Sequence, residues 1–319
     1  MKTVVLALLP IFDALFAPLV ICAALILKLT RRVGVQRLTL CKRILLFVGV
    51  FPIRNHYYEP LFDPKELQAP LSNERLLPGL DLNVQEQLDL LAEFGCEDEL
   101  LGLTGKKTDE LTFHFDNEAF RSGDAEYLYN LIRLKKPKRI YEIGSGNSTL
   151  MAIKATLRNA AETPGYNCDH VCVEPYEMPW LERSGVTVVR QRVQDLPVAF
   201  FGVLEKDDLL FIDSSHMIRP QGDVLYEYLQ LLPTLAPGVI VHLHDIFTPR
   251  DYLESWVIDE VKFWNEQYLL EALLTGTKSW KVLGALNFLK NNYYRELKAK
   301  CPFLTPDREP GSFYLEKIS

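Results

Sequence analysis

Residues 139–149 read RIYEIGSGNST, and this stretch decides the fold class. Its first half has the length and composition of a buried strand, and a helical pattern begins directly after its second half. Gly144 and Gly146 permit a tight turn and a close approach of the backbone. Ser148 or Thr149 can cap the helix that follows. The stretch therefore predicts a strand, a turn of small residues and a helix.

The same alternation of strand and helix patterns continues to the C-terminus. Helical patterns at Asn83–Phe94 and Asp124–Leu134 precede the first strand. The β-rich runs are Arg139–Ile143, Val171–Val173, Val186–Arg190, Leu209–Ile212, Val239–Leu243, Trp280–Leu283 and Phe313–Leu315. Strands that alternate with helices indicate βαβ units. We therefore expect an α/β fold with a doubly wound, mostly parallel, seven-stranded sheet covered on both faces.

Polar residues follow the later strands, at the edge where ligands bind in such sheets. They are Glu174, Gln194–Asp195, Asp213–His216 and His244–Asp245. An acid after the second strand is placed to bind vicinal ribose hydroxyls, although a solvated loop acid fits the same position. The residues after the third strand can contact an adenine edge. We therefore expect a nucleoside-binding site at this edge.

These motifs together resemble one enzyme family. EIGSGNST (142–149), VCVEP (171–175), VQDL (193–196), LLFIDSSH (209–216) and PGVIVHLHD (237–245) occur in this order. They resemble class I S-adenosylmethionine (SAM)-dependent methyltransferases, most closely the O-methyltransferase-like group with IDxxH after the fourth strand and HD after the fifth. The resemblance covers about residues 120–319. It implies a Rossmann-like fold, SAM as cofactor and a final antiparallel strand at GSFYLEK (311–317).

The resemblance also implies roles for individual residues. Those assigned to the cofactor are Glu142, Gly144, Ser145, Gly146, Asn147, Ser148, Glu174, Asp195 and Asp213. Glu142 and the turn after it would hold the amino-acid part, Glu174 the ribose and Asp195 the adenine region. Two features depart from the family pattern. Ser148 replaces the third glycine of the usual GxGxG turn, and the 32 residues from Glu142 to Glu174 are a longer connection than usual.

Methylation of a hydroxyl requires alignment of the acceptor and removal of its proton. We expect His216 or His244 to act as general base, with Asp245 orienting that histidine or the substrate. Related O-methyltransferases use a divalent metal held by carboxylates, and Asp213 with Asp245 could hold one here. His244 interrupts that pattern, so the metal stays an open alternative. His242 fits a structural histidine on the same strand face as His244.

Two other functions remain as alternatives. NAD-dependent oxidoreductases also use a glycine turn and a ribose acid, but their pyrophosphate typically needs GxGxxG. Thr149 stands at the third glycine of that pattern, which favours a cofactor without phosphate. A non-catalytic, membrane-bound binding protein could keep the same fold. The presence of Glu142, Gly144, Gly146 and Glu174 together argues against that alternative.

The N-terminal segment differs from the rest of the chain. Val4–Leu27 contains 24 residues with one charge, and as a helix it would extend about 36 Å, enough for the roughly 30 Å of a bilayer core. We expect a retained membrane segment; a signal peptide and a buried soluble helix are the alternatives. Pro10, Asp13 and Pro18 leave a kinked or re-entrant helix open. Basic and apolar residues alternate in Leu29–Pro52, which predicts an interfacial helix.

The distribution of charge supports this division into an N-terminal segment and a globular body. The net charge of −7 argues against a general nucleic-acid binder. It is the sum of +7 in residues 1–54 and −14 in residues 55–319. We expect a membrane anchor and basic interfacial segment at 1–54, a helical and loop lead-in at 55–120 and the methyltransferase domain at 121–319. The basic flank after the apolar run predicts a cytoplasmic catalytic domain. A membrane-held enzyme suggests a small-molecule or lipid-linked acceptor.

The six cysteines include no CxxC pair, which fits reduced thiols in the cytosol. Cys168 and Cys172 flank His170. No second pair of metal ligands lies nearby in the sequence, so we do not expect a zinc site there.

Overall fold

The computed structural model describes residues 2–103, 106–107 and 109–319. The chain forms two compact units, Met1–Gln68 and Ala69–Ser319, and each is described by itself.

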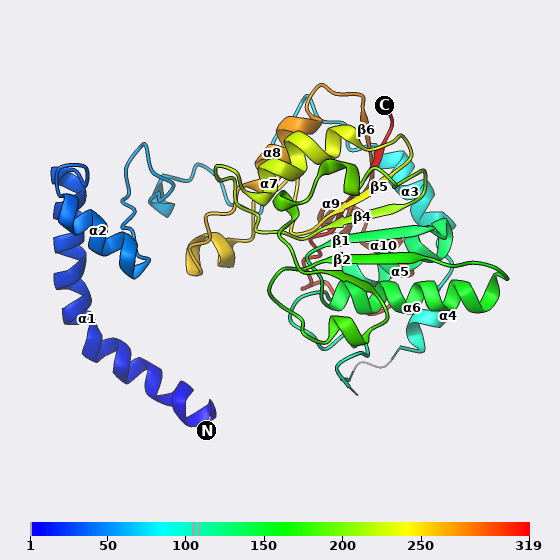
Figure 1. The fold of residues 1–319 in the computed structure, drawn as a ribbon, viewed down its shortest axis with the longest axis horizontal. Coiled ribbons are helices and arrows are strands. Elements are labelled where there is room, and N and C mark those ends of the chain that lie inside the picture. Colours follow the sequence, from blue (N-terminus) through cyan, green and yellow to red (C-terminus); the bar gives the residue numbers. More distant parts are fainter. Residues whose placement is uncertain (1, 104–105, 108) are drawn as a thin grey trace. The chain divides into compact units, whose positions relative to one another are not determined.

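A seven-stranded sheet forms the centre of the Ala69–Ser319 unit (Figure 1), with the strand order β3-β2-β1-β4-β5-β7-β6. The strands are β1 (Arg139–Ile143), β2 (Asp169–Val173), β3 (Thr187–Val189), β4 (Leu209–Ile212), β5 (Ile240–Leu243), β6 (Trp280–Ala285) and β7 (Phe313–Lys317). The first five strands pair in parallel, and β7 lies antiparallel between β5 and β6. The predicted α/β, Rossmann-like, mostly parallel sheet is therefore confirmed, including its final antiparallel strand.

Helices cover both faces of this sheet. They are α3 (Val84–Glu93), α4 (Glu97–Leu101), α5 (Asp124–Lys135), α6 (Asn147–Glu162), α7 (Asp223–Tyr226), α8 (Glu266–Leu274), α9 (Leu286–Asn292) and α10 (Tyr294–Lys300). Short 3₁₀ or π turns lie at Pro64–Glu66, Leu181–Arg183, Val193–Asp195, Val198–Phe200, Glu227–Leu231, Leu232–Thr234 and Ser255–Asp259. Residues of α5 and α6 share a buried cluster with one sheet face, and residues of α7 and α8 share another with the opposite face.

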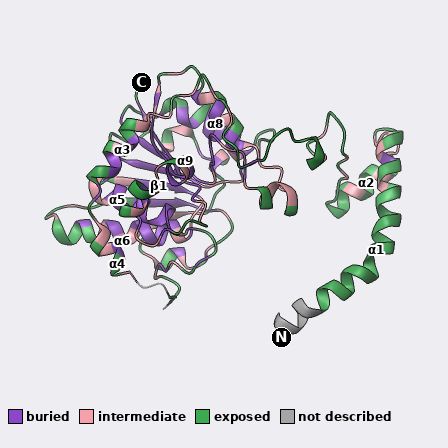
Figure 2. Ribbon diagram, turned by 180° about the vertical axis from the view of Figure 1, so that it is seen from behind, coloured by how far each residue is buried: buried purple, intermediate pink, exposed green. Residues whose placement is uncertain are grey.

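Alternation along the strands divides the core into these two layers. In β1, Ile140 packs in the layer of α5 and α6, whereas Tyr141 and Ile143 pack in the layer of α7 and α8. Figure 2 shows the sheet as the most buried part of this unit. Each fully buried aliphatic side chain contributes about 1.5–3 kcal/mol. Glu142 is an exception in this apolar strand, because it is a fully buried acid.

The helix after β1 begins earlier than the sequence predicts. Helix α6 starts at Asn147 with Gly146 as its N-cap residue, so neither Ser148 nor Thr149 occupies the cap. Thr149 instead stands at the third helical position, where its hydroxyl accepts a hydrogen bond of 3.0 Å from the Gly146 N–H. The same hydroxyl donates to Glu142. The turn is therefore closed by Thr149 from inside the helix.

The Met1–Gln68 unit contains α1 (Lys2–Val33) and α2 (Thr39–Val48). Helix α1 continues through Pro10 and Pro18. Its Leu8–Val33 part is long and apolar enough to cross a membrane, with a mean hydropathy of 2.3 in a window that has no buried residue among those described. A signal sequence meets the same criteria, so the helix alone is weak support for membrane association.

The predicted interfacial helix over Leu29–Pro52 is wrong at both ends, because α2 begins at Thr39 and ends at Val48. Residues 29–33 belong to α1, and Gly34, with a φ of +102°, lies between this helix and α2. A positive φ of this kind favours glycine and ends a helix. None of the ten described residues of α2 is buried. Phe47 is 92% exposed.

Glu59 connects the end of α1 to the chain that follows α2. Its carboxylate forms ion pairs with Arg31 at 2.5 Å and with Arg54 at 3.1 Å. Burial alone would raise the pKa of Glu59, but hydrogen bonds from Arg54 and Arg31 lower it to about 2. The Arg31 guanidinium also lies 5.0 Å from the centre of the Phe51 ring. These contacts fix residues 51–59 against the basic end of α1.

Candidate functional site

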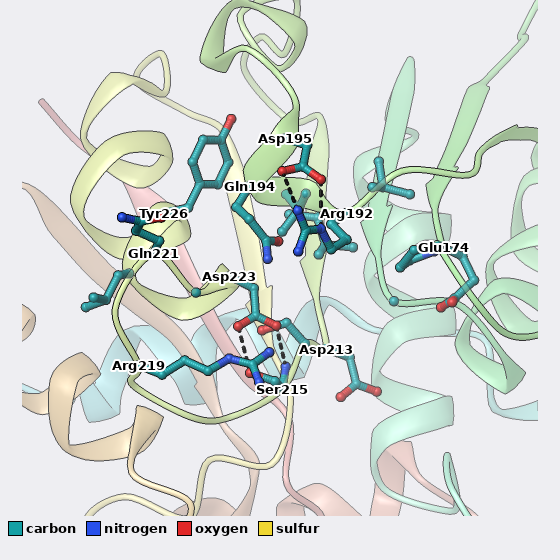
Figure 3. A pocket seen from close by; sticks show the side chains of 18 of the residues that line it. Glu174, Arg192, Gln194, Asp195, Asp213, Ser215, Arg219, Gln221, Asp223 and Tyr226 are labelled. Atoms are coloured by element: carbon teal, nitrogen blue, oxygen red, sulfur yellow. Dashed lines mark hydrogen bonds and ion pairs between the residues drawn. The ribbon is translucent and has the colours of Figure 1, made fainter. Parts of the chain in front are cut away.

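A cavity of about 1290 Å³ opens at the carboxyl ends of the parallel strands (Figure 3). It lies where the strand order reverses, between β1 and β4, which is the usual ligand position in such sheets. Among its lining residues are Gly144, Glu174, Gln194, Asp195 and Asp213. We call this the first cavity. Its volume is sufficient for a nucleoside-sized ligand.

Gly144 fits a position that no other residue could occupy without strain. Its φ is +78°, and a Cβ atom there would lie 2.0 Å from the carbonyl oxygen of Asp213. The Asp213 N–H in turn donates to the carbonyl of Ile143 over 2.8 Å. Glycine therefore allows the ends of β1 and β4 to meet closely at the bottom of the first cavity.

The other residues of the predicted turn are not part of the described lining of the first cavity. Gly146, Asn147 and Ser148 form the start of α6, and the described lining of the first cavity does not include them. The Ser145 hydroxyl is buried and has no hydrogen-bond partner among the described residues. The structure therefore brings Gly144 to the cavity and leaves the remainder of the turn as its support.

Glu142 also lies beneath the turn rather than in the described lining. Its side chain is fully buried, and Oε2 accepts hydrogen bonds from the Thr149 hydroxyl and, over 3.6 Å, from the Cys172 thiol. In the structure Glu142 supports the start of α6 through its hydrogen bond with Thr149.

Glu174 follows β2 and lines the first cavity. Its Oε1 atom accepts hydrogen bonds of 2.9 Å from the backbone N–H groups of both Tyr176 and Glu177. Among the described residues, Oε2 accepts no hydrogen bond. The carboxylate is therefore held in a fixed orientation with one oxygen available, which suits recognition of a pair of hydroxyls.

Asp195 also lines the first cavity, but its carboxylate already has a partner. Arg192 binds it through two parallel hydrogen bonds of 2.7 and 2.9 Å (Figure 3). Such paired contacts fix both side chains. The charged groups of the lining are five carboxylates and two guanidinium groups: Glu174, Glu177, Asp195, Asp213, Asp223, Arg192 and Arg219. The first cavity is therefore acidic overall.

The residues after β4 and β5 come together in a buried cluster around His216. His216 Nε2 lies 3.2 Å from Asp213 Oδ1 and 3.5 Å from Asp245 Oδ2. Its Nδ1 atom lies 2.8 Å from Glu266 Oε2. His216 and Asp245 both have a φ of +57°, a strained backbone conformation that is common at functional sites. We call these four residues the His216 cluster.

Glu266 is the member of the His216 cluster that the sequence did not indicate. It is the first residue of α8 and is 1% exposed. Its Oε1 atom accepts a hydrogen bond of 3.0 Å from the Tyr228 hydroxyl. It also stands 50 residues after His216 and follows no strand, so no strand-end pattern could have identified it.

The charges of the His216 cluster determine which residues can accept a proton. Burial would lower the pKa of His216, but hydrogen bonds to Asp213 and Glu266 raise it well above 6.5. Burial likewise opposes the charged form of His244, yet the nearby carboxylates of Asp245 and Asp213 raise its pKa. Both rings therefore favour the imidazolium form, which has no free nitrogen to accept a proton.

The pKa values of Asp245 and Asp213 shift in opposite directions. Burial raises the pKa of Asp245, and the positive charges of His244 and His216 limit the rise. Burial also acts to raise the pKa of Asp213, but His244 and His216 lower it overall. Asp245 is therefore the stronger base of the two. Burial and the neighbouring His244 hold the pKa of His242 well below 6.5, consistent with a neutral structural histidine.

A second cavity of about 320 Å³ adjoins the His216 cluster. Asp245 and His244 line it, together with Arg121, Phe247 and Trp256. Asp213 lines the first cavity and Asp245 lines the second. His216 lies between these two carboxylates, so the cluster connects the two cavities.

The same cluster contains donors that could hold a cation. One ligand atom from each of Asp213, His216 and Asp245 lies within 4.8 Å of the others. Two carboxylates and an imidazole suit a divalent transition metal. When His216 is protonated, however, its Nε2–H group is a positively charged donor directed at both carboxylates, so Nε2 cannot bind a metal ion. A metal ion at this position would have to replace that proton.

One family model and one curated protein are similar to parts of this chain. Residues 141–246, from β1 to just beyond β5, match a family model described as a methyltransferase domain. An uncharacterized protein from Archaeoglobus fulgidus is 29% identical over 207 residues, which cover 57% of this chain and 88% of that protein.

Two crystal structures are also similar to this chain. One is the O-methyltransferase TomG from Streptomyces achromogenes, involved in tomaymycin synthesis, in complex with SAM. Its sequence is 16% identical to this chain, and the TM-score is 0.38 over 61% of this chain and 79% of TomG. The other is an O-methyltransferase from Bacillus cereus in complex with S-adenosylhomocysteine (SAH), with 13% identity and a TM-score of 0.37, over 73% of this chain and 91% of that one.

Proposed function

We propose that the Ala69–Ser319 unit is a methyltransferase that transfers a methyl group from SAM to a hydroxyl of a small or lipid-linked acceptor. The observation that carries this proposal is the position of the His216 cluster, with Asp213 on the first cavity and Asp245 on the second. The first cavity would hold the cofactor and the second the acceptor. The match of residues 141–246 to a methyltransferase domain supports this assignment.

The charge of the first cavity favours SAM over NAD. SAM carries positive charge on its sulfur and its amino group, whereas NAD carries a negatively charged pyrophosphate. The lining has more carboxylates than guanidinium groups, and Arg192 is already paired with Asp195. The Gly146 N–H at the start of α6 is occupied by Thr149, so it cannot bind a phosphate oxygen. The ribose hydroxyls would bind Glu174 Oε2.

SAM supplies a methyl group on a positively charged sulfur, which becomes a neutral thioether when the acceptor oxygen displaces it. The chain's part is to position the acceptor and to take its proton. We assign the proton to Asp245, whose carboxylate faces the second cavity. The raised pKa values of His216 and His244 favour this assignment over either histidine as the base.

His216 would act by holding the two carboxylates. Its imidazolium can donate from Nε2 toward Asp213 and Asp245, while Glu266 accepts from Nδ1–H and fixes the ring. The ring of Trp264 lies 4.3 Å from that of His216 and packs against it. This arrangement keeps Asp245 directed toward the acceptor before the methyl group is transferred.

A divalent cation is a second candidate component of this site. Asp213, Asp245 and a neutral His216 would hold it, and it would polarise the acceptor oxygen. We propose that transfer does not require it, because the His216 imidazolium already supplies positive charge at that position. Activity should then survive removal of metal by EDTA at neutral pH. Complete loss on EDTA treatment, with recovery on adding Mg²⁺ or Mn²⁺, would show the opposite.

We propose further that the Met1–Gln68 unit attaches the enzyme to a membrane with the catalytic unit in the cytoplasm. The apolar length of Leu8–Val33 supports the attachment, and the basic residues after it support the orientation. Helix α2 would lie at the surface, because it exposes Phe47 beside Lys42 and Arg43. Such an anchor suits an acceptor that is amphipathic or lipid-linked.

The test is transfer of a labelled methyl group by the full-length protein in detergent. The wild-type protein and Asp245→Asn are incubated with methyl-labelled SAM and an extract of cellular lipids and small molecules. We expect label in an acceptor fraction with the wild type and a large loss with Asp245→Asn. Tight binding of SAM without any transfer would favour the non-catalytic binding protein. Unchanged transfer by Asp245→Asn would remove that residue as the base.

A further inference from the structure

Three side chains with metal-binding atoms lie together below the glycine turn, apart from the His216 cluster. They are Glu142 on β1 and His170 and Cys172 on β2. Glu142 is directly opposite Cys172 in the sheet, and His170 is opposite Ile140, so all three project from the same sheet face. All three are buried: Glu142 and Cys172 are 0% exposed and His170 is 8% exposed.

Glu142 Oε2 accepts hydrogen bonds from Thr149 and Cys172, but three other polar atoms of this group have no hydrogen-bond partner among the described residues. In the described chain, Glu142 Oε1 and both ring nitrogens of His170 are buried without a hydrogen-bond partner. His170 Nε2 and Glu142 Oε1 lie 3.6 Å apart, which is too long for a hydrogen bond between them. Buried polar groups in proteins almost always have partners, so three unpartnered atoms in one place require an explanation.

The spacing of these atoms fits coordination of one ion. One ligand atom from each residue lies within 4.8 Å of the other two. Cys172 Sγ lies 3.6 Å from Glu142 Oε2, which equals the separation of His170 Nε2 from Glu142 Oε1. These two separations, one to each oxygen of Glu142, are close to those between neighbouring ligand atoms bound at about 2.0–2.3 Å to one ion. Thiolate, imidazole and carboxylate together are ligands typical of zinc.

We infer that Glu142, His170 and Cys172 form a buried structural site for a zinc-type divalent metal ion. The ion would connect β1 to β2 directly under the turn that supports the first cavity. The metal replaces the thiol proton of Cys172, which is released to solvent, so binding should strengthen as the pH rises.

The sequence argued against zinc because it showed no second pair of ligands near His170. The missing ligand is Glu142, which precedes His170 by 28 residues and reaches it only through the pairing of β1 with β2. Cys168, the other cysteine beside His170, precedes β2 and does not belong to the group of three.

Cobalt in place of zinc provides a direct test, because a cobalt–thiolate bond gives a charge-transfer absorption band. The full-length protein is produced in medium supplied with Co²⁺, and its bound metal is counted by elemental analysis. We expect one tightly bound ion per chain and the thiolate band. Cys172→Ser should lose the band, and the matched control Cys168→Ser should keep it. Asp213, His216 and Asp245 contain no sulfur, so metal bound there cannot produce this band.

Several results would overturn the inference. A folded wild-type protein that retains neither zinc nor cobalt after purification has no such site, and this measurement does not depend on any variant. Retention of the thiolate band in Cys172→Ser, or its loss in Cys168→Ser, would assign the metal to another cysteine. His170→Asn provides a second variant if Cys172→Ser does not fold, and it should also lower the bound metal. SAM binding does not enter these readouts, so the proposed function can fail independently.

Discussion

Replacement of Glu266 by glutamine removes one negative charge from the His216 cluster and keeps the shape of the side chain. Glu266 Oε2 lies 2.8 Å from His216 Nδ1, and both residues are buried. A hydrogen bond to a charged partner contributes about 1 kcal/mol more than a neutral one. That difference corresponds to about one pKa unit. We therefore expect Glu266→Gln to lower the pKa of His216 by about one unit, while the hydrogen bond to Asp213 continues to raise it.

The sign of the effect on stability follows from the direction of this pKa shift. The folded-state pKa of His216 lies above its unfolded value, so its contribution is complete below about pH 6.5 and disappears as the pH rises through the folded-state pKa. Glu266→Gln should then cost about 1 kcal/mol of stability at low pH. The difference from the wild type should narrow as the pH rises. Chemical denaturation of the full-length protein in detergent, at a series of pH values, measures this difference.

The same substitution should affect the rate. If the His216 imidazolium positions Asp245, activity falls when the ring loses its proton, and the alkaline limb of the pH–rate profile should move about one unit lower in Glu266→Gln. Glu227→Gln is the matched control. Burial and the nearby Glu266 raise the pKa of Glu227 well above 4.5, which favours its uncharged form, so we expect glutamine to change the charge of this region less than Glu266→Gln does. An unmoved alkaline limb in Glu266→Gln, or an equal shift in Glu227→Gln, would refute this reasoning.

Three further predictions concern other parts of the chain. Glu174→Gln should weaken SAM binding about tenfold by calorimetry, because the ribose hydroxyls lose a charged acceptor; unchanged affinity would remove Glu174 from the site. Gly144→Ala should lower the unfolding midpoint, because its φ of +78° disfavours alanine by about 1–2 kcal/mol and the new Cβ would displace Asp213; an unchanged midpoint would contradict this close approach. Phe47→Asp should release more protein from membranes at high salt while SAM affinity stays constant; unchanged membrane partition would argue against an interfacial α2.

The strands were the most predictable part of the fold, for a physical reason. Each strand is a short apolar run bounded by turn residues, a pattern that can be read from the local sequence alone. The observed bounds of β1 and β4 are the predicted ones. Helix boundaries were less predictable. The sequence suggested Ser148 or Thr149 as the cap of α6, but the extended backbone at Gly146 places the helix start two residues earlier than Thr149. The Thr149 hydroxyl, which bonds the Gly146 N–H from inside the helix, fixes this start.

The site was predictable where it follows the strands. Residues after β4 and β5 had to meet at one edge of the sheet, and the structure brings Asp213, His216 and Asp245 together there. The sequence could not indicate Glu266, because α8 reaches the cluster only through tertiary packing. It also could not show that Glu142 lies beneath the first cavity rather than in its lining, since that depends on which sheet face its side chain occupies. The roles of these residues remain predictions.

Calorimetry of the full-length protein in detergent tests most directly whether the first cavity is a site for SAM. The protein is titrated in turn with SAM, SAH and NAD, and Glu174→Gln is titrated in parallel. We predict that SAM and SAH bind with a stoichiometry of one per chain, that NAD does not bind, and that Glu174→Gln weakens binding of both sulfur compounds. Binding of NAD without binding of either sulfur compound would contradict the proposed function.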